Sequence, residues 1–201
     1  MGKELEYKLQ VGDPGLLKKI MADPRIETLS TEEFHETAMH TEYFDSPDHR
    51  FSQRHWTLRR RQEGEVSVIC VKTPTGERHT RGEWQIIGKV LDDQAITALV
   101  EDGAPLELLY LYGAGDIEPV CGAKFLRRHK MLRFPDGSEA ELACDQGLLL
   151  GKTETMSLCE AELELYKGAP EEMLQLVRYL CETYGLKEQP RSKVARARSL
   201  K

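Results

Sequence analysis

The chain has 201 residues, 31% of them charged, and a formal net charge of -6 at pH 7. This length predicts one domain, residues 1–201, with a substantial core, and the acidic balance argues against nucleic-acid binding. Any positive site must therefore be local. No apolar run in the sequence approaches the length of a membrane span, and residues 2–10 lack the apolar core of a signal peptide. We therefore expect a cytoplasmic protein without a membrane partner.

The cysteines are five in number, widely spread, and include no CxxC pair. Such a set is typical of reduced thiols in a hydrophobic core. Their spacing relative to the six histidines does not suggest a zinc site. A metal ion, if the protein binds one, should be held by oxygen ligands.

The first predicted strand covers residues 3–9, KELEYKL. With a period of two, one face carries two carboxylates and an ammonium and the other carries apolar side chains. The charged face comprises Glu4, Glu6 and Lys8. A solvated edge strand is one explanation of this pattern, and a functional face is the other.

The next segments alternate between helix and strand. Residues 16–26 have helical spacing, and a strand through Tyr43 and Phe44 ends at the turn residues 45–48. The segment 56–62, WTLRRRQ, places Arg59 and Arg61 on one face of a strand and Arg60 on the other. We expect Arg60, like Arg128 further on, to be a surface charge, and Trp56 to have a packing role in the core or on the surface.

Residues 65–73 form the clearest strand, since they are rich in β-branched residues and apolar on both faces. Lys72 lies at the end of this strand, and residues 81–90 resume as a strand after a turn. A helical crossover should start near Gln94 and extend to Tyr112.

The second half begins with a hairpin of residues 123–134 and 139–146, joined by a Pro-Asp-Gly turn. The strand 158–166 then carries a second acidic row, which comprises Glu160, Glu162 and Glu164. A helix opens at Pro170 and ends near Gly185. The segment 147–153, GLLLGKT, is not a P-loop, because it has one residue too few between its glycines and is followed by a strand.

The rows of charge on several strands have two explanations. On a flat sheet they could simply be solvated. In a closed antiparallel barrel they would line the lumen, with helices covering the apolar outer faces. So many buried charges are costly without a ligand, and metal cations with a polyanion would offset them.

The ordered set of motifs resembles the CYTH superfamily, the triphosphate tunnel metalloenzymes. The set begins with the ExExK pattern of residues 4–8 and continues along nearly the whole chain. The further motifs are YFDSPD at 43–48, LRRR at 58–61, Lys72, RGEW at 81–84, residues 125–127, ACDQG at 143–147, EAELEL at 160–165, and Ser192 with Lys193. ExExK alone is a weak signal, whereas the ordered set is specific.

The resemblance implies a fold that is mainly β with peripheral helices and forms a closed antiparallel eight-stranded β-barrel tunnel. Within the superfamily, the sequence is most similar to bacterial inorganic triphosphatases. It implies one or two Mg²⁺ or Mn²⁺ ions, with Glu4 and Glu6 facing Glu160 and Glu162 across the lumen. The implied metal ligands are Glu4, Glu6, Asp145, Glu160, Glu162 and Glu164. The implied phosphate ligands are Lys8, Arg59, Arg61, Lys72, Arg127 and Lys193, with Arg81 and Glu83 in support.

The implied reaction is hydrolysis of triphosphate to diphosphate and phosphate. One metal ion would bridge phosphate oxygens and a second would activate a water, which Glu6 or Glu162 could orient beside Lys8. Glu83 could instead fix a tunnel arginine, and Glu141 could support Asp145 or be solvated. Two other functions stay open. The first is processing of nucleoside or thiamine triphosphates, including cyclisation of ATP as in class IV adenylate cyclases. The second is a polyphosphate-binding module without turnover.

Overall fold

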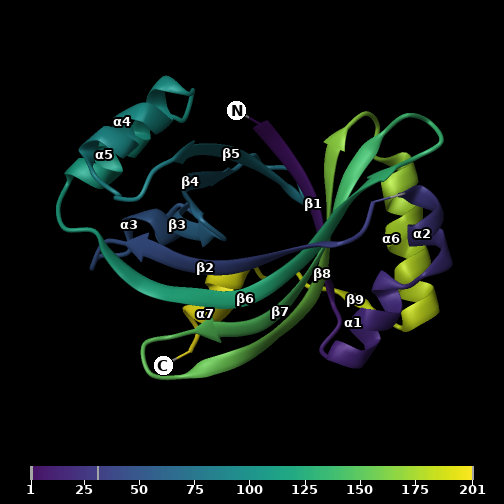
Figure 1. Cartoon of the computed structure of the whole chain (residues 1–201). Coiled ribbons are helices and arrows are strands. Elements are labelled where there is room, and N and C mark those ends of the chain that lie inside the picture. Colours follow the sequence, from purple (N-terminus) through teal and green to yellow (C-terminus); the bar gives the residue numbers. More distant parts are fainter. Residues whose placement is uncertain (1, 31, 201) are drawn as a thin grey trace.

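The computed structural model describes residues 2–30 and 32–200 and is built mainly from strands (Figure 1). The strands are β1 (Gly2–Gln10), β2 (His35–Asp45), β3 (Thr57–Glu63), β4 (Val66–Pro74), β5 (Thr80–Ile87), β6 (Glu118–Arg133), β7 (Glu139–Leu150), β8 (Thr155–Lys167) and β9 (Lys187–Glu188). The helices are α1 (Pro14–Met21), α2 (Pro24–Leu29), α3 (Arg50–Gln53), α4 (Asp93–Glu101), α5 (Glu107–Gly113), α6 (Glu171–Tyr184) and α7 (Lys193–Ala197).

The strands form one antiparallel sheet in the order β5-β4-β3-β2-β6-β7-β8-β1-β9. An additional pairing between β1 and β5 closes β1 to β8 into a ring. The strand β1 serves both neighbours because its first half pairs with β5 and its second half with β8. The closed antiparallel eight-stranded barrel expected from the sequence is therefore confirmed for the described residues.

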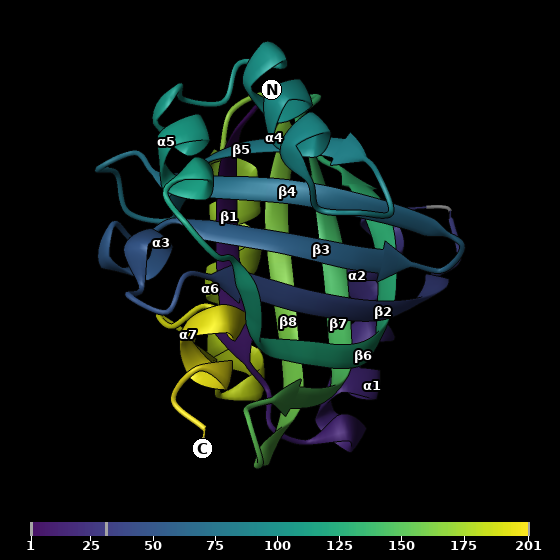
Figure 2. The same cartoon turned by 90° about the vertical axis from the view of Figure 1, so that its left-hand side faces the viewer.

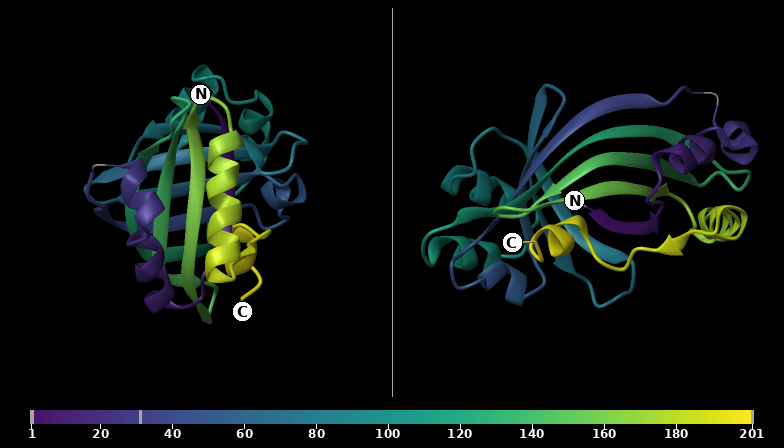
Figure 3. Two further views of the ribbon diagram at one scale, coloured as in Figure 1. Left: turned by 90° about the vertical axis from the view of Figure 1, so that its right-hand side faces the viewer. Right: turned by 90° about the horizontal axis from the view of Figure 1, so that it is seen from below.

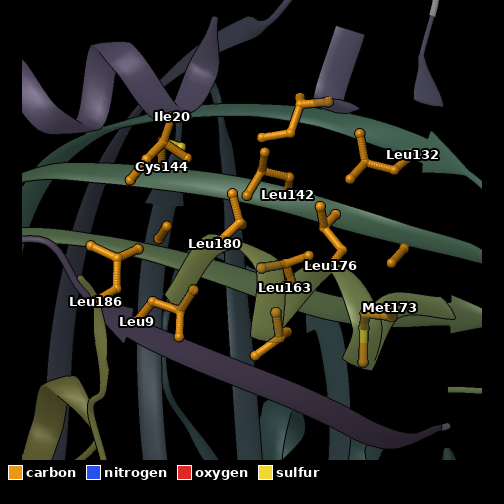
Figure 4. Close-up of a cluster of buried hydrophobic side chains, with 14 of the residues drawn as sticks. Leu9, Ile20, Leu132, Leu142, Cys144, Leu163, Met173, Leu176, Leu180 and Leu186 are labelled. Atoms are coloured by element: carbon orange, nitrogen blue, oxygen red, sulfur yellow. The ribbon is translucent and has the colours of Figure 1, made fainter. Parts of the chain in front are cut away.

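The helices α1 and α6 cover the outer face of β7 and β8 (Figure 3). Strand alternation turns Leu142 and Leu163 outward, where they meet Leu176 and Leu180 of α6 and Ile20 of α1 in one buried cluster (Figure 4). The expected helix after Pro170 is confirmed, with Gly185 in a left-handed conformation at its end. This packing leaves the charged faces of the same strands on the inside.

A second helical layer, α4 with α5, covers β4 (Figure 2). Ile69 and Val71 of β4 contact this layer, and Trp56 packs partly buried against the same cluster, which agrees with the predicted packing role. The crossover expected as one helix is two, since the chain turns at Gly103 with φ 102° and a proline follows two residues later. The helical segment 16–26 is likewise split into α1 and α2, because Asp23 and Pro24 start a new helix.

Two further expectations concern the barrel strands. The GLLLGKT segment runs from the end of β7 through a turn towards β8, which confirms that it is not a P-loop. The two acidic rows do not face one another across the lumen, so that expectation is wrong. They lie side by side on adjacent strands, since Glu6 pairs with Glu164 and Lys8 with Glu162 in the β1–β8 register.

No helix in residues 2–30 or 32–200 has the length and apolar character that a membrane span requires.

Candidate active site

The barrel encloses a cavity of about 490 Å³, and each of β1 to β8 contributes side chains to its wall. The wall residues of each strand are alternate ones, such as Arg59, Arg61 and Glu63 of β3, because successive side chains point to opposite faces. Twelve residues singled out from the sequence line this cavity. They are Glu4, Glu6, Lys8, Arg59, Arg61, Lys72, Arg81, Glu83, Arg127, Glu162, Glu164 and Lys193.

Three carboxylates of the cavity wall form a cluster that we call the cavity triad: Glu4, Glu83 and Glu164. One oxygen of each lies within 4.8 Å of the others. Lys72 Nζ donates to both oxygens of Glu4, at 2.7 and 2.6 Å, and Arg59 Nη2 donates to Glu83 at 3.2 Å. Glu164 has no ion pair with any residue in the described part of the chain.

The cavity triad is short of positive charge. Burial, together with the neighbouring carboxylates of Glu4 and Glu6, raises the pKa of Glu164 to about 8. Burial and Glu162 likewise raise the pKa of Glu6 to about 7, although Lys8 opposes this shift. Burial also acts to raise the pKa of Glu83, but Lys72 and Arg59 outweigh it and lower the value to about 2. Carboxylate oxygens with unbalanced negative charge are what Mg²⁺ and Mn²⁺ bind, so these residues fit a divalent cation.

A second acidic cluster, which we call the socket triad, comprises Asp145, Glu160 and Glu162. Its carboxylate oxygens also lie within 4.8 Å of one another. Lys193 Nζ lies 2.8 Å from Asp145 Oδ2, 2.6 Å from Glu160 Oε1 and 2.6 Å from Glu162 Oε1. Asp145 and Glu160 do not line the cavity wall of the described residues, because both are buried behind it.

Two arginines complete the socket triad. Arg127 donates to both oxygens of Asp145, at 2.8 and 2.7 Å, and to Glu162 at 2.6 Å. Arg196 pairs with the second oxygen of Glu160. Burial opposes ionisation of Glu162, but Lys193 and Arg127 outweigh it and hold its pKa well below the ordinary value. The socket triad is therefore an acidic cluster whose charge is already neutralised.

Guanidinium groups dominate the basic part of the cavity. Burial, followed by the nearby charges of Arg59 and Arg127, lowers the pKa of Arg61, which shows that these cations crowd one another. Arg61 Nε is held by Glu63 at 2.6 Å, whereas Arg59 Nε is buried without a hydrogen-bond partner among the described residues. Crowded cations and a buried donor without an acceptor suit an anion with several oxygens.

Charged residues on the outside of the barrel and in the cavity wall have specific partners. As predicted, Arg60 and Arg128 lie on the outside of the barrel, where they pair with Glu42 and Glu36. Glu83 both joins the cavity triad and holds Arg59, and Glu141 accepts from His129 Nδ1 at 3.0 Å.

Sequence reasoning missed Arg196, Glu63 and Cys70, whose Sγ donates to Glu83 Oε1 at 3.0 Å. Strand parity could have found Glu63, two residues after Arg61. The helical spacing of three from Lys193 could have found Arg196.

A barrel of this kind defines a class of protein: an enclosed tunnel with a cluster of guanidinium groups next to a cluster of carboxylates. The comparisons with known proteins identify the class more closely. The CYTH domain family model matches residues 2–197, so the chain belongs to the CYTH family.

Individual relatives share less sequence than fold. The inorganic triphosphatase of Haemophilus influenzae is 26% identical over 144 residues, which is 69% of this chain and 39% of that protein. This chain therefore matches well under half of the length of that relative. A putative adenylyl cyclase from Hippeastrum, described as having a dominant triphosphatase activity, superposes with a TM-score of 0.62 at 18% identity, covering 98% of this chain and 96% of the other. A putative adenylate cyclase from Bacillus halodurans gives 0.58 at 15% identity, with 96% of each chain covered.

Proposed function

We propose that the protein hydrolyses inorganic triphosphate to diphosphate and phosphate with a divalent cation, Mg²⁺ or Mn²⁺, inside the barrel. The observation that carries the proposal is the joint presence of two opposite deficits in one cavity. Among the described residues, Arg59 Nε is a buried donor without an acceptor, and Glu164 is a partly buried carboxylate that makes no ion pair. A complex of triphosphate with a divalent cation compensates both. The CYTH family membership and the relative named inorganic triphosphatase support it.

In this proposal the basic residues bind phosphate oxygens. Arg59, Arg61 and Arg127 present planar donor forks, and Lys8 and Lys72 present ammonium groups next to the acidic end. Arg81 and Ser192 also line the cavity and can contribute to its polar wall. A polyanion held by fixed cations in a buried site reacts without reorganising solvent around its developing charge.

The cavity triad would hold the cation, with Glu6 beside it. When bound, such an ion withdraws charge from the phosphate oxygens and lowers the pKa of a bound water. Three strands, β1, β5 and β8, would each contribute one carboxylate to bind the ion: Glu4, Glu83 and Glu164. Lys72, which contacts both Glu4 and Glu83, links the cation site to the phosphate site.

Glu6 is the better candidate for the group that accepts the proton of the attacking water. Its carboxylate lines the cavity beside the cavity triad, and Lys8 donates a hydrogen bond to Oε2 and holds the side chain in place. Glu162 has a depressed pKa and its oxygens are taken by Lys193 and Arg127. The oxygen of the attacking water would form a bond to a terminal phosphorus as the bridging phosphoanhydride bond breaks and diphosphate leaves. The proton of the water would pass to Glu6 and then to solvent.

The substrate assignment favours a triphosphate without an organic group. Trp56, which could have stacked on a thiamine ring, packs in the cluster with α4 and α5 and is absent from the cavity wall of the described residues. The runner-up functions predicted from the sequence remain the alternatives that an experiment must separate.

The experiment is release of phosphate from triphosphate, ATP and thiamine triphosphate, each with Mg²⁺ or Mn²⁺ and with EDTA as the blank. We expect the fastest release from triphosphate, and loss of that release in Glu4→Gln. The outward Arg60→Ala is the matched control for a general loss of charge. Faster turnover of ATP or thiamine triphosphate overturns the substrate assignment, and binding without release favours the polyphosphate-binding module.

A further inference from the structure

We propose that Lys193 is a built-in cation that occupies the socket triad in place of a second divalent ion, so that the barrel binds one metal ion, at the cavity triad. The inference rests on the proposed function only for the presence of a metal site in the barrel. It assigns to α7 a role in setting how many metal ions the tunnel takes.

The first argument is the position of the ammonium. Lys193 Nζ lies within 2.8 Å of one oxygen from each of Asp145, Glu160 and Glu162, and it donates a hydrogen bond to Glu162. Such distances are those of charge-assisted contacts between an ammonium and carboxylates. The ammonium thus stands at the point where the three carboxylates converge.

The second argument is the balance of charge. The socket triad carries three negative charges, and three cations, Lys193, Arg127 and Arg196, contact it. A divalent ion added to this neutral cluster would bury two uncompensated positive charges, which is costly. The cavity triad differs, because only two cations, Lys72 and Arg59, contact its three carboxylates, and Glu164 makes no ion pair with a described residue.

The third argument is that the rest of α7 fixes the position of Lys193. Ala197 packs in a buried cluster with Leu149 and Leu158 of β7 and β8. Arg198, directly after α7, pairs with the fully buried Asp45 at the end of β2. Lys193 is 8% exposed, so its side chain is held at the socket triad by the packing of α7 and does not move freely in solvent.

The test counts bound Mn²⁺ on the full chain without any phosphate compound, by electron paramagnetic resonance of the free ion or by calorimetry. We expect one ion per intact chain, lost in Glu164→Gln and retained in Glu160→Gln. Lys193→Ala should gain a second ion, because it vacates three converging carboxylates. The double variant Lys193→Ala with Glu160→Gln should return to one ion. Arg191→Ala is the matched control, since Arg191 is an exposed basic residue near α7 that contacts only backbone there.

Two results overturn the inference. One is binding of two ions by the intact chain with one of them lost in Glu160→Gln. The other is a folded Lys193→Ala variant, checked by circular dichroism, that binds no more ions than the intact chain. If Lys193→Ala does not fold, the count on the intact chain and on Glu160→Gln still decides. Hydrolysis is not measured in this test, so a protein that binds one ion but releases no phosphate refutes the proposed function and leaves the inference intact.

Discussion

The cavity triad and the socket triad are built from the same chemical groups, yet their electrostatic states are opposite. Each has three carboxylates with oxygens within 4.8 Å of one another. Lys193, Arg127 and Arg196 neutralise the socket triad, whereas Glu164 of the cavity triad makes no ion pair with a described residue. The comparison teaches that a cluster of acids indicates a metal site only after its resident cations have been counted.

Glu164→Gln is the variant expected to have the largest effect, because it removes the unpaired carboxylate of the cavity triad. We expect Mn²⁺ binding to weaken by at least about 100-fold, since loss of a ligand costs more than loss of an outer partner. Phosphate release from triphosphate should fall with it. Glu36→Gln is the matched control, because Glu36 pairs with Arg128 on the outside of the barrel. Equal losses of Mn²⁺ binding and phosphate release in both variants would show that the effect is not specific to the cavity triad.

Arg59→Ala should have the next largest effect, because Arg59 connects the phosphate-binding part of the cavity to Glu83 of the cavity triad. We expect kcat/KM for triphosphate to fall by about 100-fold or more, as for other fixed donors to a reacting oxyanion. Arg60→Ala, one residue away and outside the barrel, should stay near the wild-type value because its pair with Glu42 is on the surface. A similar loss in Arg60→Ala would mean that the barrel, not the site, had failed.

The pH dependence of stability separates the two triads by sign. In protein without metal, the pKa of Glu164 is raised from 4.5 to about 8, so its contribution to stability is present at low pH and lost as the pH rises through about 8. The pKa of Glu162 is lowered from 4.5, so the contribution of Glu162 to stability is present at pH values above 4.5. That contribution is lost as the pH falls through the lowered pKa.

The measurement is the melting temperature in EDTA across this pH range, repeated with Mn²⁺. We expect a decline towards pH 8 that Mn²⁺ reverses and that Glu164→Gln reduces. A decline of equal size in Glu164→Gln would contradict the assignment of the alkaline loss to the cavity triad.

Cys70→Ala should have the smallest effect, because it removes one hydrogen bond to Glu83 and leaves the contacts of Glu83 with Arg59 and Lys72. We expect Mn²⁺ binding to weaken by less than about tenfold, the usual range for one hydrogen bond. Cys70→Ser, which keeps a donor at that position, should recover most of the loss. Burial raises the pKa of the Cys70 thiol to about 11, so the thiol is protonated and able to donate at neutral pH.

Most strands could be predicted from the sequence because alternation is a local property. The inward faces of β1, β3 and β8 follow from residue parity alone, as do the outward positions of Arg60 and Arg128. The helix breaks at Asp23 and Gly103 were missed because continuous apolar spacing masked a cap and a left-handed turn.

The partners of the charged residues could not be predicted, since they depend on strand order and on the docking of a terminal helix. The sequence by itself determined two acidic rows and several basic residues on alternating strand faces, and the ordered motifs implied the barrel through their resemblance to a known family. Only the tertiary structure decided that the rows are adjacent, through the β1–β8 pairing, and that α7 places Lys193 within the socket triad. The physical reason is that alternation fixes which face a side chain takes, whereas register and helix docking fix which opposite charge it meets.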